Sequence, residues 1–514
     1  MARKLTASGE FSRLAGLRQG FIERCEKYAK VTVPRLVPDE DYNLNNTELA
    51  QDYQSVGSQG AYHLVNKLML TLFAPSRPFF RVDLPPKQKA QLLEQLQIDE
   101  AQLEAALGEG EQNAVRHMDT MPLRPKLFEA LLNLIVTGNV VAHLPTDTNG
   151  EPRVFGLKQY VVRRTGTGRL RDLIVREKLR FDELEDDVQE ELRSAHKARY
   201  SNEECDVVLY RWVSRKQGGR YSETTWVDDV QLGDKFTGDY KNETECPWRA
   251  LTWNLADGDD YGTGHVEAFA GDFSALSALA EAQVKGAILA SEFRWLVNPG
   301  GMTKPEDLEQ SENGAVLPGV EGDVSLVVNS KSGDLQVVNL IMNEYTRRIG
   351  QGFLLNSAVT RDAERVTAEE IRQQAAELET SLGGVYTRLA VDLQGFLARW
   401  LLKQSGVSIN GTQLEVRIVT GLDALSRNGD LSALRFALAD LASLQNLGEA
   451  LGELNINAVV TAIFLGHGLP PSKYVKTPQQ KQEAAQAQQA AQAQQVASEQ
   501  GAKAAAQQVV RETA

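Results

Sequence analysis

The spacing of apolar residues predicts that the first quarter of the chain is helical. Residues 53–75 place apolar side chains every three or four positions, which is the period of one face of a helix. Residues 126–145 repeat the pattern until Gly138 and Asn139 interrupt it, and the short apolar run that follows predicts a strand. We expect His143, in that run, to pack at a strand edge, because no second candidate ligand stands near it.

From about Val154 to Trp253 the pattern changes to the alternation that is typical of short strands. Two hairpins are predicted, with turns at Gly166-Thr167-Gly168 and at Gly218-Gly219. These arginines of the first hairpin form the densest basic cluster of the chain: Arg163, Arg164, Arg169, Arg171 and Arg176. They either form solvated strand faces and salt bridges, or contact DNA or an acidic partner.

A turn-rich segment from Asp257 to Gly264 precedes a long predicted helix, residues 265–296, which is rich in Ala, Ser and Gly. Small side chains let helix axes approach closely, so we expect this helix to pack on other helices along much of its length. Two strand-like runs, residues 324–328 and 335–338, then predict a hairpin around Lys331-Ser332-Gly333-Asp334. A second helix, residues 340–355, brings the chain back.

A charged loop, residues 356–366, separates this second helix from a longer one, residues 367–406. Thr367 and Glu370 give the longer helix a capping box as its start signal. Its apolar positions predict one continuous buried face, and Gly383-Gly384 predicts a bend. A strand is predicted within residues 414–421. The tail, residues 477–514, is dominated by Gln and Ala, and we expect a helical bundle there that needs neighbouring chains.

Composition narrows the functions that this pattern allows. The chain has 514 residues, of which 42% are hydrophobic and 24% charged, as expected for a folded protein of several domains. Its net charge of −14 argues against tight general binding to phosphate backbones, but is compatible with a wall along which DNA slides. We expect the three cysteines to be small buried residues in a reducing compartment. No run of about eighteen apolar residues occurs, so we expect no membrane span, and synthesis in a cytoplasm.

The sequence motifs of the common enzyme classes are missing. There is no phosphate-binding loop, no dinucleotide-binding fingerprint, no zinc-protease helix and no nucleophile elbow. Asp257, Asp259 and Asp260 either bind a metal or serve the turn and the helix start that follow, and they lack the spacing of a calcium loop. We therefore expect no cofactor, no bound metal and no enzymatic activity.

Several stretches, in the same order along the chain, carry a family resemblance. The most informative is "LLNSAVTRDAERVTAEEIRQQAAELETSLGGVYTRLA", and it is accompanied by "KLMLTLFAP", "LFEALLNLIVTGNVVAHLP", "YVVRR", "DDYGTGHVEAFAGD" and "WLVNPGG". Over about residues 15–465 the chain resembles the portal proteins (head-to-tail joining proteins, or connectors) of short-tailed bacteriophages of the autographivirus type. The Gln/Ala-rich tail matches this family only in its composition.

The resemblance implies a mixed α+β fold, mainly α, assembled as a ring of about twelve subunits around a central channel. It also implies a division of the chain into named regions. These are the wing (1–264, strand-rich over 154–253), the first stem helix (265–299), the clip (300–339), the second stem helix (340–355), the channel loop (356–366), the long wing helix (367–406), the crown (407–476) and the helical tail or barrel (477–514).

The function implied by the resemblance is packaging and ejection of double-stranded viral DNA, with no active site in the chain itself. The implied partners are the capsid and scaffolding proteins, the terminase large subunit, the tail adaptor and internal core proteins, in a virion assembled in the host cytoplasm. In the channel loop, Ser357, Thr360, Arg361 and Arg365 would face DNA, or the arginines would pair with neighbouring acidic residues. Lys331, Ser332, Gly333 and Asp334 would dock partners at the clip. The alternatives are a metal-dependent DNA-processing enzyme and a head assembly scaffold or adaptor.

Overall fold

The structure is a computed structural model that describes residues 6–39, 42–43, 45–74, 78–98, 100–146, 150–200, 204–291, 294–312, 314–327, 332–355, 368–405, 417–420, 459–460 and 463. Its internal contacts divide the chain into two compact units. The first unit comprises Met1–Leu72 and Pro122–Phe396, and the second comprises Phe73–Met121 and Leu397–Ala514. No helix within these described ranges is long and apolar enough to cross a membrane.

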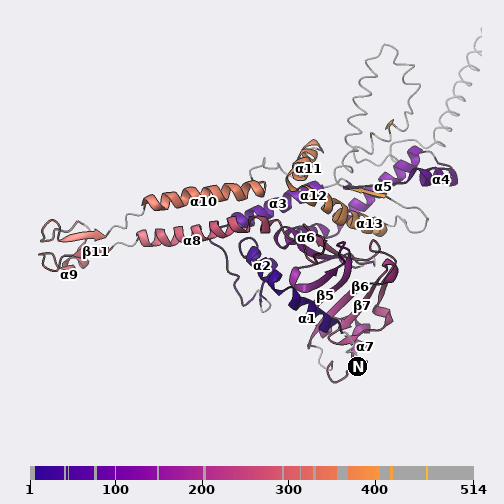
Figure 1. The fold of residues 1–514 in the computed structure, drawn as a ribbon, viewed down its shortest axis with the longest axis horizontal. Coiled ribbons are helices and arrows are strands. Elements are labelled where there is room, and N and C mark those ends of the chain that lie inside the picture. Colours follow the sequence, from indigo (N-terminus) through magenta and orange to yellow (C-terminus); the bar gives the residue numbers. More distant parts are fainter. Residues whose placement is uncertain are drawn as a thin grey trace, which may run out of the picture. The chain divides into compact units, whose positions relative to one another are not determined.

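The first unit contains a six-stranded antiparallel sheet, in which the order is β4-β5-β6-β7-β8 and β9 also pairs with β7 (Figure 1). The strands are β4 (Tyr160–Arg164), β5 (Leu170–Arg180), β6 (Asp206–Arg215), β7 (Tyr221–Val227), β8 (Val230–Gln231) and β9 (Gly238–Tyr240). Both predicted hairpins are confirmed, because β4 pairs with β5 and β6 pairs with β7. A short helix, α7 (Asp186–Ala195), lies in the connection between β5 and β6.

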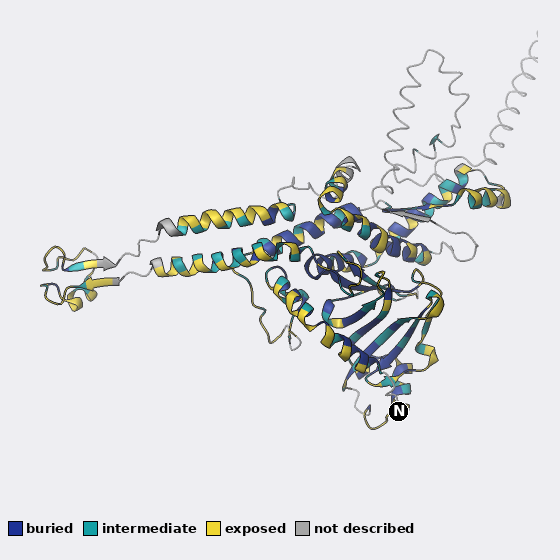
Figure 2. Ribbon diagram, in the orientation of Figure 1, coloured by how far each residue is buried: buried dark blue, intermediate teal, exposed yellow. Residues whose placement is uncertain are grey.

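Alternating side chains bury both faces of this sheet (Figure 2). On one face, α1 (Ala7–Leu17) packs Phe11 and Leu14 against Val161 and Ile174 of the strands. The opposite face forms a second core with α2 (Gln19–Lys30) and with a separate three-stranded sheet. This second core includes Cys25, Val141, Phe155, Tyr160, Leu173, Tyr221 and Trp248.

The three-stranded sheet has the order β10-β2-β3, with β10 (Trp248–Thr252), β2 (Asn139–His143) and β3 (Arg153–Phe155). Two predicted helices are confirmed as α3 (Val56–Leu72) and α6 (Leu123–Thr137), and β2 is the strand predicted after the second. Gly138 ends α6 in the left-handed conformation, with φ of 78°, and its N–H donates to the Leu134 carbonyl at 3.0 Å.

The two helices predicted on either side of the clip are present as α8 (Ala270–Ser291) and α10 (Ser332–Gly352), which pack together. The first helix is shorter than predicted, because it ends at Ser291 instead of residue 296. Residues Arg294–Val297 form strand β11 instead. Trp295, Leu296 and Val297 are residue types that favour strands, and β11 gains hydrogen bonds by pairing with β12 (Val324–Val327).

The predicted hairpin around Lys331-Ser332-Gly333-Asp334 is wrong. Strand β12 is present, but its partner is β11, and residues 335–338 belong to α10. Ser332, Gly333 and Asp334 begin that helix, whereas Lys331 lies outside the described residues. Leu335 packs close to Gly286 of α8: a Cβ added to Gly286 would lie 3.1 Å from the Leu335 Cδ2. Packing between the helices therefore overrides the strand-like pattern of this short apolar run.

The long helix predicted after Thr367 is divided into segments. Helix α11 (Ala368–Leu382) begins beside Thr367, which itself lies outside the described residues, so the capping box is not described. Gly383, with φ of 56°, breaks the helix where a bend was predicted, and α12 (Gly384–Leu389), a π-helical turn (Ala390–Gln394) and α13 (Gly395–Gln404) follow. The predicted buried face includes Ala375, Leu378, Leu389, Leu393, Phe396 and Trp400.

The second unit joins segments that are distant in sequence. Strand β1 (Phe80–Asp83) pairs with β13 (Arg417–Thr420), which confirms the described part of the strand predicted within residues 414–421. Helices α4 (Pro86–Leu96) and α5 (Glu100–Thr120) belong to the same unit, and the buried Glu111 carboxylate accepts the Val82 N–H at 2.8 Å. The predicted tail, residues 477–514, lies outside the described residues.

Candidate assembly surface and channel loop

The α8–α10 pair is an antiparallel helical hairpin with an aromatic base. His265, just before α8, donates from Nε2 to the carbonyl of Gly352 at 2.9 Å. Phe353 packs its ring against Phe269 and Phe273, with centroid separations of 5.5 and 5.9 Å. Farther along, Arg348 pairs with Asp272 at 3.1 Å. Burial lowers the pKa of His265, so this side chain is neutral and serves packing and hydrogen bonding.

Helix α3 contacts the chain on both sides of the predicted channel loop. His63 of α3 contacts the Leu354 carbonyl through Nε2 at 3.0 Å, just after α10. On the far side of the loop, Lys67 of α3 pairs with Glu377 of α11 at 2.8 Å, and the Lys67 side chain is only 7% exposed. The predicted DNA-facing residues Ser357, Thr360, Arg361 and Arg365 lie outside the described residues, so the structure describes the two anchors of this loop and not its side chains.

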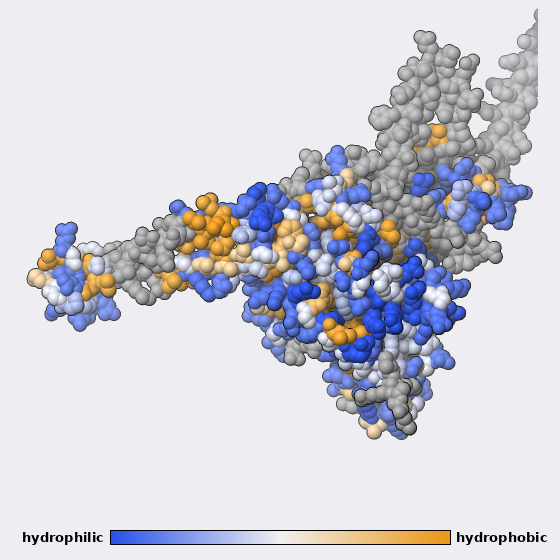
Figure 3. All heavy atoms as spheres, viewed as in Figure 1, coloured by the Kyte–Doolittle hydropathy of each residue, from blue (hydrophilic) through white to orange (hydrophobic). Residues whose placement is uncertain are grey.

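Exposed apolar side chains lie on both helices of the hairpin. On α10, Val337, Leu340 and Ile341 are spaced three and four residues apart, and Leu340 is 69% exposed. On α8, Val284, Ile288 and Leu289 are also exposed. Figure 3 shows hydrophobic residues gathered over this part of the hairpin. We call these six residues the stem stripe. Exposed apolar surface that is contiguous and built on regular helices is typical of a surface that another protein covers.

Charged residues of the hairpin pair locally. Glu281 and Lys285 are joined at 2.6 Å, and Glu344 and Arg347 at 2.7 Å. The hydrogen bond from Arg347 lowers the pKa of the Glu344 carboxyl. These pairs are solvent-exposed and contribute little to stability, but they leave the surface around the stem stripe nearly neutral. A neutral, apolar surface is suited to contact with protein rather than with phosphates.

The segment between α8 and α10 is a small module with its own internal support. Strands β11 and β12 form its sheet, and α9 (Pro305–Glu309) lies between them. The Asp323 carboxylate accepts three backbone N–H groups, from Met302 at 2.8 Å and from Thr303 and Val320 at 3.3 Å. Its exposed apolar side chains are Trp295, Leu296, Met302, Val316 and Val320. The module therefore presents apolar groups on a loop framework that one carboxylate organises.

We expect Asp323→Asn to loosen this module. The hydrogen bonds, from Met302 first, hold the pKa of Asp323 below its usual value, so their stabilisation is present above about pH 4 and is lost as the pH falls toward the lowered pKa. Hydrogen exchange followed by mass spectrometry should show faster exchange in residues 302–303 of the variant near neutral pH. In the wild type, exchange corrected for intrinsic pH dependence should rise on acidification, and in the variant this rise should be missing.

The matched control for this prediction is Asp307→Asn, which removes an exposed carboxylate from α9 in the same module. It should leave exchange in residues 302–303 unchanged. Equal exchange in the two variants would mean that the Asp323 contacts do not organise the loops.

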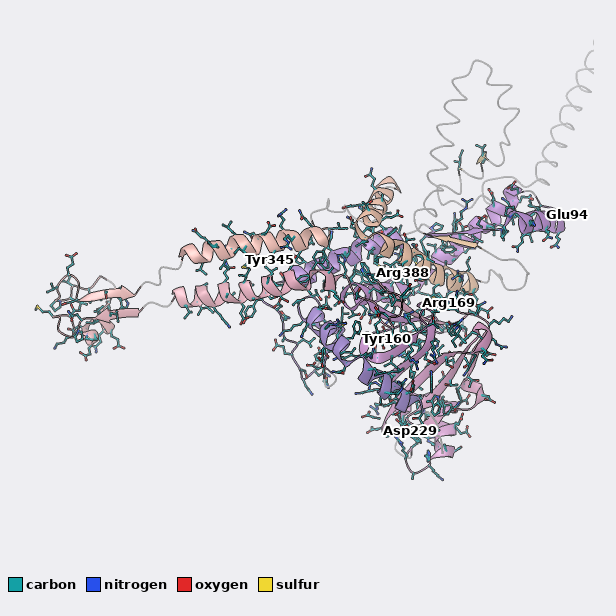
Figure 4. The ribbon with its side chains drawn as sticks, in the orientation of Figure 1. Glu94, Tyr160, Arg169, Asp229, Tyr345 and Arg388 are labelled. Atoms are coloured by element: carbon teal, nitrogen blue, oxygen red, sulfur yellow. The ribbon has the colours of Figure 1, made fainter. Side chains whose placement is uncertain are left out.

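The arginine cluster of the first hairpin is partly architectural. The Arg164 guanidinium is buried and donates to the carbonyls of Ala250, Asp260 and Gly168 at 2.9–3.1 Å. Arg176 stacks over the Phe11 ring at 4.7 Å. Arg169, labelled in Figure 4, is exposed in the turn between β4 and β5. Arg164 and Arg176 thus make contacts inside the fold that are not salt bridges, whereas Arg171 forms the predicted kind of salt bridge, with Asp172 at 3.6 Å. Contact of the cluster with DNA stays a prediction.

The aspartate segment before α8 acts as a turn. The Asp260 carboxylate accepts the backbone N–H of Arg164 at 2.5 Å, and the Asp259 N–H donates to the Ala256 carbonyl at 3.2 Å. In the part of the chain that the structure describes, no three His, Cys, Asp or Glu side chains come together as a metal site would require. The observed contacts favour the turn interpretation of Asp260 over metal binding.

Buried titratable residues in the first unit serve packing. Burial raises the pKa of the Cys25 and Cys246 thiols to about 12 in each case, so both are protonated and buried, as predicted. Cys205, which was also predicted to be buried, is only partly buried. Burial lowers the pKa of His143 to about 3, and its ring stacks on Trp248 with centroids 4.1 Å apart. The predicted packing role of His143 is confirmed, but its place at an edge is wrong, because β2 is the central strand and His143 pairs with Trp248 on one side and Arg153 on the other.

The stem stripe was missed by sequence reasoning, although a signal exists. Apolar residues of α10 occur on more than one face: Leu335 is half-buried near α8, whereas Val337 and Leu340 are exposed. A helix with apolar residues on two faces needs two partners. Among the described residues, α8 covers one of those faces, and Val337 and Leu340 lie on the other.

Comparisons with known proteins agree over most of the length. A family profile described as bacteriophage head to tail connecting protein matches residues 4–475. The chain is 32% identical to the portal protein of Escherichia phage T7 over 499 residues, covering 94% of this chain and 91% of that protein. It is 32% identical to the portal protein of Enterobacteria phage SP6, covering 81% and 79%, and 30% identical to that of Pseudomonas phage phiKMV, covering 91% and 94%. A chain in a solved gene transfer agent virion is similar with a TM-score of 0.34 and 14% identity, covering 75% of this chain and 98% of that one.

Proposed function

This chain belongs to the bacteriophage head-to-tail connecting protein family, and from that premise we propose that it is a portal protein, located at one vertex of a phage capsid. It forms a ring through which double-stranded DNA is packaged and ejected. The observation that carries this conclusion is the similarity to portal proteins over nearly the full length of both chains. Because the similarity covers more than nine tenths of both chains, the function of the whole protein, and not of one domain, is inferred.

The stem stripe supports assembly into a ring. A closed ring requires a heterologous contact, in which one surface of each subunit meets a different surface of the next. The six exposed apolar residues of α8 and α10 supply one such surface, and the small residues of α8 allow a neighbouring helix to approach closely. We infer that the stem helices of adjacent subunits pack through this stripe, with twelve subunits as the expected number.

The purified full-length protein should therefore appear as rings with a central hole in negative-stain electron microscopy. Class averages would also give the ring size directly. A protein that stays monomeric in solution and in virions would contradict the portal function.

The channel loop is the part of the ring that we propose to meet DNA. The chain before the loop contacts His63 of α3, and the helix after the loop pairs with Lys67 of α3. The loop, residues 356–366, therefore joins two segments that the same helix holds. Arg361 and Arg365 supply positive charge to a chain that is acidic overall, and a small number of phosphate contacts would hold DNA without preventing it from sliding.

Deletion of Ser357–Arg365 is expected to leave rings intact and to lower DNA retention in packaged heads. The double variant Arg361→Gln, Arg365→Gln should reproduce the loss if charge is the cause, and Arg361→Lys, Arg365→Lys should restore it. Nuclease-protected DNA per head measures retention. Loss of ring assembly in the deletion would instead show that the loop is architectural.

We propose that the β11–β12 module is the clip, at which the terminase large subunit docks during packaging and the tail adaptor docks afterwards. Its exposed Trp295, Met302 and Val316 provide apolar anchors of the kind that dominate binding energy at interfaces. Capsid, scaffolding and internal core proteins are the other proposed partners. Neither a metal-dependent enzyme nor a separate scaffold gains support, since Asp260 is engaged by Arg164 and the similarity is to portal proteins themselves.

A further inference from the structure

A pocket of about 260 Å³ lies in the first unit, away from the stem hairpin. Its walls come from α1, α2, strand β4 and the turn before α8. Leu14, Leu17 and Phe21 form an apolar side, and Asp259 and Asp260 lie on another. Arg18, at the junction between α1 and α2, lines the pocket as well.

Arg18 is buried, and no carboxylate of the described part of the chain pairs with it. Its side chain is 7% exposed, and its guanidinium lies over the rings of Tyr261 and Tyr160, at 5.3 and 5.9 Å from their centroids. Tyr160 is labelled in Figure 4. The Tyr261 hydroxyl receives one hydrogen bond from Arg18. The Nε and Nη1 atoms of Arg18 find no acceptor among the residues that the structure describes.

A guanidinium does not lose its proton in proteins, so burial of Arg18 leaves a permanent charge with unused donors in a poorly solvated place. Such a group strongly favours any acceptor that can reach it. A guanidinium presents its donors as a planar fork, which matches the two oxygens of a carboxylate. The pocket beside Arg18 has room for such a group.

The walls of the pocket restrict which anion fits. The apolar side formed by Leu14, Leu17 and Phe21 suits a short aliphatic stem behind the carboxylate. Asp259 and Asp260, offset in part by Arg24, which also lines the pocket, repel a doubly charged phosphate more strongly than a singly charged carboxylate. Leu17 is 75% exposed and extends the apolar side to the surface of the protein, as a surface covered by another chain would.

We propose that this pocket binds a carboxylate on a short aliphatic stem, and that an acidic side chain of the neighbouring copy of this chain supplies it in the ring. The source of the carboxylate rests on the proposed function, whereas the pocket itself does not. The chain carries 69 acidic residues against 55 Lys and Arg, so acidic side chains are abundant on the adjoining copy. An acidic side chain of one subunit would then pair with the buried Arg18 of the next.

Propionate, which resembles the end of a glutamate side chain, is the probe, and propionamide is its neutral counterpart. Saturation-transfer NMR on the unassembled fraction of the full-length chain, separated by size exclusion, should show propionate binding and no propionamide binding. Arg18→Met should abolish the signal. Arg18→Lys keeps the charge but loses the fork, so it should weaken binding by at least about tenfold. Arg169→Met, which removes an exposed arginine outside the pocket, should bind like the wild type.

The assembled fraction then tests whether the neighbouring subunit supplies the carboxylate. Rings should bind propionate at least about tenfold more weakly than the unassembled chain, since a neighbour already occupies the pocket. Equal binding by both fractions would overturn the neighbour as the source. No binding by the unassembled chain would overturn the pocket proposal, and would mean that water alone satisfies Arg18. Propionate binding by the unassembled chain is measured without rings. A failure of the pocket proposal can therefore be distinguished from a failure of the proposed portal function.

Discussion

Leu340→Glu is expected to yield a folded chain that no longer assembles into rings. Leu340 lies at the centre of the α10 part of the stem stripe, between Val337 and Ile341, and is 69% exposed in the single chain. Burying a leucine in a contact contributes about 1.5–3 kcal/mol, and placing an unpaired carboxylate in the same contact costs several more. Because a closed ring repeats the contact between every pair of neighbours, the penalty is repeated at each of them.

Light scattering after size exclusion, together with negative-stain images, measures this loss of assembly. The matched control is Asn343→Glu, which adds the same charge to the same helix at an exposed polar position. The control should assemble like the wild type, and both variants should keep the wild-type circular dichroism spectrum. Rings formed by Leu340→Glu at wild-type concentrations would exclude the stem stripe from the interface, without deciding whether the wild-type protein is a portal.

The elements that were predicted correctly from the sequence are those whose apolar pattern extends without interruption over a whole strand or several helical turns. Strands β4 to β7 alternate apolar and polar residues over five to eleven positions, so they could be placed with their turns. Helices α3 and α6 have apolar stripes of four turns or more, and Gly138 marks the end of the second. In each case the local pattern and the tertiary contacts favour the same structure.

The errors fall where a short apolar run has two possible structures. Residues 335–338 are compatible with a strand or with the first turns of a helix, and contact with α8 decides for the helix. The pattern predicts residues 294–296 as the end of the first stem helix, because 26 residues separate β11 from its partner β12 and no local signal joins the two strands. Pairing at that separation depends on the fold of the intervening segment.

The candidate sites depend on contacts that a sequence pattern does not contain. The channel loop could be located from its charged residues between two predicted helices, and the family resemblance supplied its expected contact with DNA. The structure adds that α3 contacts the chain on both sides of the loop, at Leu354 and at Glu377. Arg18 could not be distinguished from other arginines of the first helices. Its burial arises from Tyr160 and Tyr261, which are more than a hundred residues away in the sequence. A buried charge of this kind is visible only after folding.

Gly138→Ala is expected to be the most destabilising of the single substitutions considered for the first unit. A Cβ at this position would lie 2.4 Å from the Thr263 carbonyl carbon and 2.5 Å from the Gly264 nitrogen, and backbone atoms have no side chain to rotate away. The φ of 78° adds strain for any residue with a Cβ. Together these effects should lower the free energy of unfolding by about 3–5 kcal/mol.

The contacts around Gly138 explain why this loss of stability would also affect ring assembly. Asn139 exchanges two hydrogen bonds with Gly262, at 2.6 and 2.8 Å, and the Gly138 carbonyl accepts the Trp253 N–H at 2.9 Å. These bonds join α6 and β2 to the turn that leads into α8. A shift of this turn would move the start of the stem hairpin relative to the sheets of the same unit, so ring assembly should weaken even where the chain still folds.

Urea unfolding followed by tryptophan fluorescence measures the effect close to its source, since the buried Trp253 is bonded to Gly138 itself. Gly166→Ala is the matched control, because a Cβ there has no neighbour within 4 Å, and its midpoint should change by an amount equivalent to less than about 0.5 kcal/mol. Equal urea midpoints for Gly138→Ala and Gly166→Ala would show that the turn at residues 262–264 can shift to accommodate the added Cβ at little cost in stability. The stem hairpin would then be held mainly by the packing of Phe353 against α8 and by its contacts with α3.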